Sequence, residues 1–152
     1  VRVLLADATL QVTGSGHVPE GGFHRDGAVI DPAAHDGLLR LARCALLCND
    51  AQLHRDEAGG WTLAGDPTEG ALLTLALKAG LNLAEAGERT PRIDVIPFES
   101  EHRYMATLHH DHEGHHLVLL KGARESALSH PSGISYAIPA RHVREMMARQ
   151  RP

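Results

Sequence analysis

The chain has 152 residues, of which 43% are hydrophobic and 22% are charged, and its formal net charge is -4. This composition is typical of one folded globular domain and excludes a disordered or collagen-like chain. The longest apolar runs fall far below the roughly 18 residues that a membrane-spanning helix needs. The cations are scattered along the chain, so no nucleic-acid partner is expected.

The chain starts at Val1 without an initiator Met or a targeting segment. We therefore expect residues 1–152 to be a single domain excised from a larger protein. The only cysteines, Cys44 and Cys48, are spaced four apart within a helical pattern. We interpret them as small buried hydrophobic residues rather than a disulfide or a metal site, which favours a reducing, cytosolic compartment.

The first 60 residues predict a hairpin, a loop and a helix. Residues 1–5 and 10–13 are β-prone runs, and a glycine-rich loop, residues 14–22, follows them. That loop lacks the Lys-Ser/Thr and the helix that a phosphate-binding P-loop requires. Between Leu38 and Asn49, apolar residues recur at three- and four-residue spacing, which predicts a helix with one buried face.

A second helix is predicted after a short strand over residues 61–63. Asp66 is suited to cap its N-terminus, Pro67 suits the first helical position, and Glu69 suits a capping box. The helix should run to about Ala79, where a glycine ends it.

The second half predicts a polar connector over residues 82–91 and then central strands. Residues 92–98, 104–109 and 116–120 are expected to form antiparallel strands. A short helix near Ala123 and a final helix over residues 139–149 complete the expected elements.

Three motifs follow one another along the chain: Asp66-Pro67-Thr68-Glu69, then Pro97-Phe98-Glu99-Ser100-Glu101-His102-Arg103-Tyr104-Met105, then Lys121-Gly122-Ala123. In this order they resemble the nucleotide-binding domain of P-type cation-transporting ATPases. The form of the second motif is similar to that of bacterial pumps of the calcium-transporting group. The resemblance implies an α+β fold in which helical pairs pack against a twisted antiparallel β-sheet.

The resemblance also implies a set of ATP contacts. Phe98 would stack on adenine and Met105 would pack beside the base. Lys121 and Gly122 would form the cavity wall, and Arg103 would reach toward the phosphates. Glu69 would contact the adenine amino group, although its capping-box role also explains a glutamate at that position.

No Asp-Lys-Thr-Gly-Thr run, which carries the family's phosphorylated aspartate, occurs in this chain. We therefore expect no catalytic residue here, and binding of ATP, with Mg2+ in the intact pump, without turnover. The partners implied are the phosphorylation and actuator domains and the transmembrane helices of the same pump. The chain would be a cytoplasmic domain of an integral membrane protein. A self-sufficient nucleotide hydrolase is disfavoured because the chain has no phosphate cradle and no dedicated magnesium site.

A histidine-rich stretch, residues 109–116, offers a function of another class. It holds five of the twelve histidines, and neutral imidazoles are good ligands for zinc, copper or nickel. The alternative hypothesis is a non-catalytic metal-binding or interaction module. We favour a polar hairpin tip without a metal, because turns collect such residues.

Overall fold

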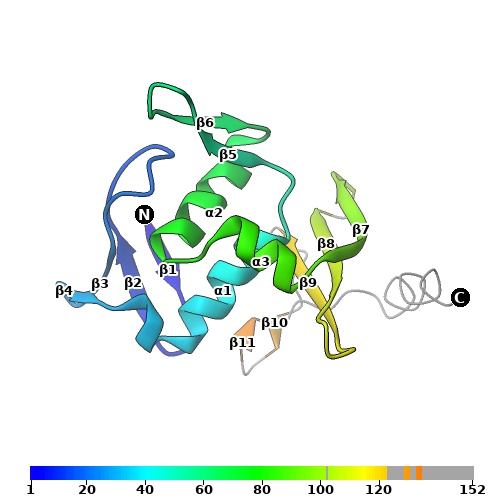
Figure 1. Cartoon of the computed structure of the whole chain (residues 1–152). Coiled ribbons are helices and arrows are strands. Elements are labelled where there is room, and N and C mark those ends of the chain that lie inside the picture. The colour runs from blue at the N-terminus through cyan, green and yellow to red at the C-terminus, as the bar shows by residue number, and fades with distance from the viewer. Residues whose placement is uncertain (102, 123–128, 131–132, 135–152) are drawn as a thin grey trace, which may run out of the picture. The chain divides into compact units, whose positions relative to one another are not determined.

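The computed structural model describes residues 1–101, 103–122, 129–130 and 133–134. Contacts within the chain group it into two compact units, Val1–Leu83 and Ala84–Pro152 (Figure 1). The expectation of a single domain remains a prediction. The helices predicted near Ala123 and over residues 139–149 lie outside the described residues. No helix in the described part is long and apolar enough to cross a membrane.

The first unit begins with a four-stranded antiparallel sheet in the order β1-β2-β3-β4. Its strands are β1 (Arg2–Leu4), β2 (Thr9–Val12), β3 (Phe23–Arg25) and β4 (Ala28–Ile30). The predicted β1–β2 hairpin is confirmed, but β3 and β4 were not foreseen. Asp26 and Gly27 join them with positive φ angles of 52° and 83°, the backbone that an Asp-Gly hairpin turn needs.

The 3-10 helix η1 (Pro32–Ala34) precedes α1 (Asp36–Leu47), and α2 (Pro67–Lys78) lies further along the chain. Both predicted α-helices are confirmed, and they pack against each other as a pair. Of the positions that the spacing predicted to be buried, Leu38, Ala42 and Ala45 are buried, but Leu41 is 39% exposed. Leu46 and Leu47, which the spacing did not single out, are buried as well. Cys44 and Cys48 form no disulfide with each other. Cys48 is fully buried as predicted, whereas Cys44 is only half-buried.

A hairpin of β5 (Gln52–Arg55) and β6 (Trp61–Ala64) separates the two helices in sequence. Only the region of β6 was predicted. The hairpin packs against α2. Leu53 of β5 and Leu73 of α2 are buried there, and Trp61 of β6 packs against them. This small cluster fixes the helix on the hairpin through apolar contact.

At the start of α2 the Asp66 cap and the first-position Pro67 are confirmed. The predicted capping box of Glu69 stays a prediction, because the Glu69 carboxylate accepts from the backbone N–H groups of Asp50 and Ala51. The Asp66 carboxylate accepts hydrogen bonds from the backbone N–H groups of Thr68 and Glu69, at 2.8 and 3.1 Å. Gly80, just beyond the C-terminal end, has a φ of 83°, the left-handed conformation expected there. Near that end, the Lys78 ammonium donates to the Thr13 carbonyl at 2.7 Å and ties the helix to the loop after β2.

The second unit contains a three-stranded antiparallel sheet in the order β7-β8-β9. Its strands are β7 (Arg92–Glu99), β8 (Tyr104–His110) and β9 (His116–Gly122), as the sequence predicts. A second, two-stranded sheet pairs β10 (Ser129–His130) with β11 (Gly133–Ile134). Strand β8 is central, and its residues 104–109 are all buried.

Residues 82–91, predicted to be a polar connector, instead contain the helix α3 (Leu83–Arg89). Apart from Gly87, its residues are good helix formers, and Glu85 and Arg89 form an ion pair of 3.5 Å one turn apart. No residue of α3 is buried, so it lacks the apolar periodicity that reveals a helix in sequence. The α+β class is confirmed, with the described strands divided among four small antiparallel sheets.

Candidate nucleotide-binding site

Phe98 lies in an irregular part of β7, next to the end of the strand. Ile96 pairs with Ala106 and Glu99 pairs with Tyr104, so two residues of β7, Pro97 and Phe98, oppose Met105 alone. Such a bulge changes the direction in which side chains project from a strand. Phe98 is 58% exposed, although large aromatic side chains are usually well buried. Its ring is therefore accessible to solvent or a ligand.

Met105 and Lys121 continue the same row across the sheet. Met105 on β8 pairs with Lys121 on β9, so their side chains project from the same face. Met105 is fully buried, whereas Lys121 is partly exposed at the outer strand. The row Phe98, Met105 and Lys121 thus brings together one residue from each of β7, β8 and β9, the three strands in the right of Figure 1.

Arg103 and Gly122 lie next to this row, at the end of the sheet that holds the turn between β7 and β8. Arg103 immediately precedes β8, and its φ of 55° places a non-glycine residue in the left-handed region. This conformation is uncommon and is often found at functional sites. Arg103 is exposed, and no ion pair involves it among the residues that the structure describes. Its cationic side chain lies within the turn between β7 and β8.

Gly122 is the last residue of β9 and pairs with Tyr104. A Cβ atom at this position would lie only 2.7 Å from the Arg103 carbonyl oxygen and 2.7 Å from the Tyr104 Cβ. Real Cβ atoms essentially never come so close to other heavy atoms. The glycine therefore allows β9 to approach the strained turn at Arg103, a close contact that sequence reasoning did not foresee.

Glu69 belongs to the first unit, in the first turn of α2. Its carboxylate accepts hydrogen bonds from the backbone N–H groups of Asp50 and Ala51, at 3.1 and 3.0 Å. Asn49 adds to this connection, because its side-chain amide donates to the Glu69 carbonyl and to the Ala45 carbonyl, each at 3.0 Å. Glu69 thus joins the start of α2 to the segment between α1 and β5.

Comparison with known proteins identifies the family. A family model described as "P-type ATPase, cytoplasmic domain N" matches residues 37–149. The chain therefore belongs to the cytoplasmic N domains of P-type ATPases. This match includes α1, α2 and the three-stranded sheet that carries Phe98 and Lys121.

Similar relatives are named as cation pumps. The chain is 47% identical over 124 residues to a cation-transporting ATPase of Synechocystis, covering 78% of this chain and 13% of the relative. It is 42% identical over 120 residues to a probable cation-transporting ATPase of Mycobacterium bovis, covering 78% and 13%. A calcium-transporting ATPase of Bacillus subtilis is 30% identical over 128 residues, covering 84% and 14%. The chain thus spans about an eighth of the length of these relatives.

Proposed function

We propose that this domain binds ATP through the exposed part of the β7-β8-β9 sheet. The observation that carries the proposal is the position of Phe98, an exposed aromatic ring at a strand bulge in the same row as Lys121. A purine base stacks favourably on such a ring. Met105 lies between these two positions on the central strand. Its side chain is fully buried, so it supports the surface on which the base packs.

The cations supply the second part of the proposed recognition. Arg103 lies in the turn that follows β7, and Lys121 and Gly122 end β9. A guanidinium in this turn attracts the phosphates, while Lys121 and the bare Gly122 backbone form the wall of the binding surface. Glu69 belongs to the first unit, where its carboxylate accepts hydrogen bonds from backbone N–H groups. The proposed surface does not include it, and its contact with the adenine amino group stays a prediction.

The proposed role in the whole pump follows from the family. The domain holds ATP, accompanied by Mg2+, and presents its γ-phosphate to a carboxylate nucleophile in the phosphorylation domain of the same protein. Hydrolysis there drives cation transport through membrane helices, with the actuator domain as a further partner, so this domain acts on the cytoplasmic side. The isolated chain is expected to bind ATP without releasing phosphate.

The aromatic contact is tested by calorimetric titration of ATP into the parent chain and Phe98→Ala. Loss of stacking, which is worth roughly 1–3 kcal/mol, should weaken ATP binding by about fivefold or more. Because the ring is exposed, the fold should remain. Val29→Ala, which truncates a 76% exposed apolar side chain of β4, is the matched control and should bind ATP like the parent. Equal ATP affinity in the parent and Phe98→Ala would exclude Phe98 as the residue on which adenine stacks.

The phosphate contact is tested separately with Arg103→Gly. Glycine accepts the φ of 55° at this position, so the variant removes the charge and keeps the turn. Affinity for ATP should fall up to about fivefold, as is typical of an exposed charge pair, while affinity for adenosine should stay unchanged. An equal loss for both ligands would mean that Arg103 supports the base site instead of the phosphates.

A further inference from the structure

The histidine-rich segment, residues 109–116, separates into side chains that are held by the protein and side chains that face one another. His109 is buried, with its Nδ1 atom 3.0 Å from the Thr90 carbonyl oxygen and its Nε2 atom 2.8 Å from the Thr107 hydroxyl. The His112 Nε2 atom lies 3.0 Å from the Glu88 carbonyl oxygen. These two rings are hydrogen-bonded to other parts of the protein. The side chains that face one another lie in the turn itself.

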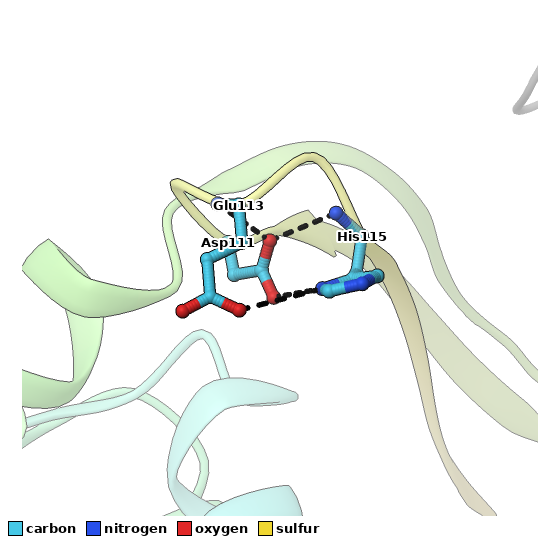
Figure 2. Close-up of side chains that lie close together, drawn as sticks. All are labelled: Asp111, Glu113 and His115. Atoms are coloured by element: carbon cyan, nitrogen blue, oxygen red, sulfur yellow. Dashed lines mark hydrogen bonds and ion pairs between the residues drawn. The ribbon is translucent and has the colours of Figure 1, made fainter.

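Within the turn, one imidazole faces two carboxylates (Figure 2). The His115 Nδ1 atom lies 2.8 Å from an Asp111 carboxylate oxygen and 3.9 Å from a Glu113 carboxylate oxygen. One ligand atom from each of the three residues lies within 4.8 Å of the others. The second Asp111 oxygen accepts the backbone N–H groups of Glu113 and His115, at 2.9 and 2.8 Å, which fixes the carboxylate in place.

The composition of this cluster selects a class of ligand. Carboxylates alone suit calcium or magnesium, whereas an added imidazole nitrogen suits zinc and other borderline divalent metals. Ligand atoms about 2.0–2.1 Å from a tetrahedral zinc ion lie about 3.3–3.4 Å from each other. The observed separations of 2.8 and 3.9 Å bracket that value, and Glu113 and His115 are exposed and free to adjust by a rotamer change.

The geometry points to a divalent zinc-class site at the tip of the β8–β9 hairpin, formed by Asp111, Glu113 and His115. The metal takes the place of the proton between the His115 Nδ1 atom and Asp111, leaving the hydrogen on Nε2. Water completes the coordination, because three side chains converge there among the residues that the structure describes. This site is independent of the proposed ATP surface and revises the sequence-based preference for a metal-free turn.

The test is a calorimetric titration of zinc chloride into the chain after removal of metal by a chelator. One zinc ion per chain should bind, and the His115 Nδ1 resonance should move to a metal-bound position in the histidine-ring nitrogen spectrum. Mutation of a residue that only hydrogen-bonds to a metal ligand typically lowers the affinity for the metal by about 10–100-fold. His115→Ala and Glu113→Gln, which each remove a ligand, should therefore lose at least about tenfold.

His116→Ala is the matched control, because it removes an exposed histidine next to the cluster but outside it. It should bind zinc like the parent, and so should Phe98→Ala. The proposal is overturned if the parent takes up no zinc, if His115→Ala and Glu113→Gln bind like the parent, or if His116→Ala loses as much affinity. Equal affinity for calcium and zinc would also contradict it. Amide spectra verify that each variant is folded.

Discussion

At the residue scale, Gly122 is the position of the proposed ATP surface that tolerates a side chain least. Alanine would place its Cβ 2.7 Å from the Arg103 carbonyl oxygen, so the turn or β9 has to move. Gly122→Ala should lower the free energy of unfolding by about 1–3 kcal/mol, as overpacking does. ATP affinity should fall with it, because the turn carries Arg103. Chemical denaturation and ATP titration measure the two effects.

A second glycine variant controls for the substitution itself. Gly87 is an exposed residue of α3, and a Cβ there meets no atom within 4 Å. Gly87→Ala should raise the free energy of unfolding by roughly 0.5–1 kcal/mol, because alanine favours a helix interior. Its ATP affinity should match that of the parent. Similar destabilisation by both variants would mean that the close contact at Gly122 has no special effect.

The Asp111 carboxyl has a pKa lowered from 3.8 to about 2, first by the backbone N–H of His115 and then by its side chain. A lowered pKa in the folded state stabilises that state above pH 3.8, and this contribution is lost as the pH falls toward about 2. With metal removed, the carboxyl carbon shift of Asp111 should titrate with a midpoint near pH 2. A midpoint near the ordinary value would show that the turn does not hold the carboxylate.

At the residue scale, the sequence suggests which side chains form the proposed surface, but it does not predict their backbone conformations. Phe98 and Lys121 are candidates because they belong to spaced motifs. The bulge at Phe98 and the left-handed conformation of Arg103 arise from pairing between β7 and β8, which depends on tertiary structure. A single sequence also gives no sign that His109 is buried while His115 faces carboxylates.

At the element scale, Glu69 connects α2 with the segment that leads into β5. Its two hydrogen bonds come from the backbone N–H groups of Asp50 and Ala51. Hydrogen bonds to charged groups are worth about 1.5–3 kcal/mol, so Glu69→Ala should lower the free energy of unfolding by about 2 kcal/mol. Urea unfolding followed by fluorescence of Trp61, the only tryptophan, measures this directly in the first unit.

Glu57→Ala is the control for this prediction, because Glu57 is an exposed carboxylate in the turn between β5 and β6. Its free energy of unfolding should stay within about 0.5 kcal/mol of the parent. If Glu69→Ala unfolds like the parent but loses ATP affinity, the carboxylate contacts nucleotide and does not connect the two segments.

The elements that sequence predicted well are those with strong local signals. Helix α2 has an Asp cap, an N-terminal proline and a glycine after its end, and β7, β8 and β9 are long β-prone runs. The elements that it missed are short or exposed. Strands β3 and β4 have three residues each, and α3 buries nothing, so neither produces a clear periodic pattern.

At the scale of the whole molecule, the chain is the N domain of a P-type ATPase, and its proposed task is to bind and orient ATP for chemistry performed elsewhere. The residues proposed for that task all lie in the second compact unit, on the three-stranded sheet and its turns. The proposed zinc-class site lies at the opposite end of β8 from Arg103, since β8 runs from Tyr104 to His110. ATP binding and metal binding are therefore separable by mutation.

The most direct test of the central claim is an ATP titration of the chain followed by amide chemical shifts. The account predicts saturable shifts that are largest at Phe98, Met105 and Gly122 and that disappear in Phe98→Ala. Adenosine should reproduce the shifts near Phe98 but not those near Arg103. A folded chain that shows no shifts at millimolar ATP, or shifts confined to residues outside β7, β8 and β9, would contradict the proposed ATP surface.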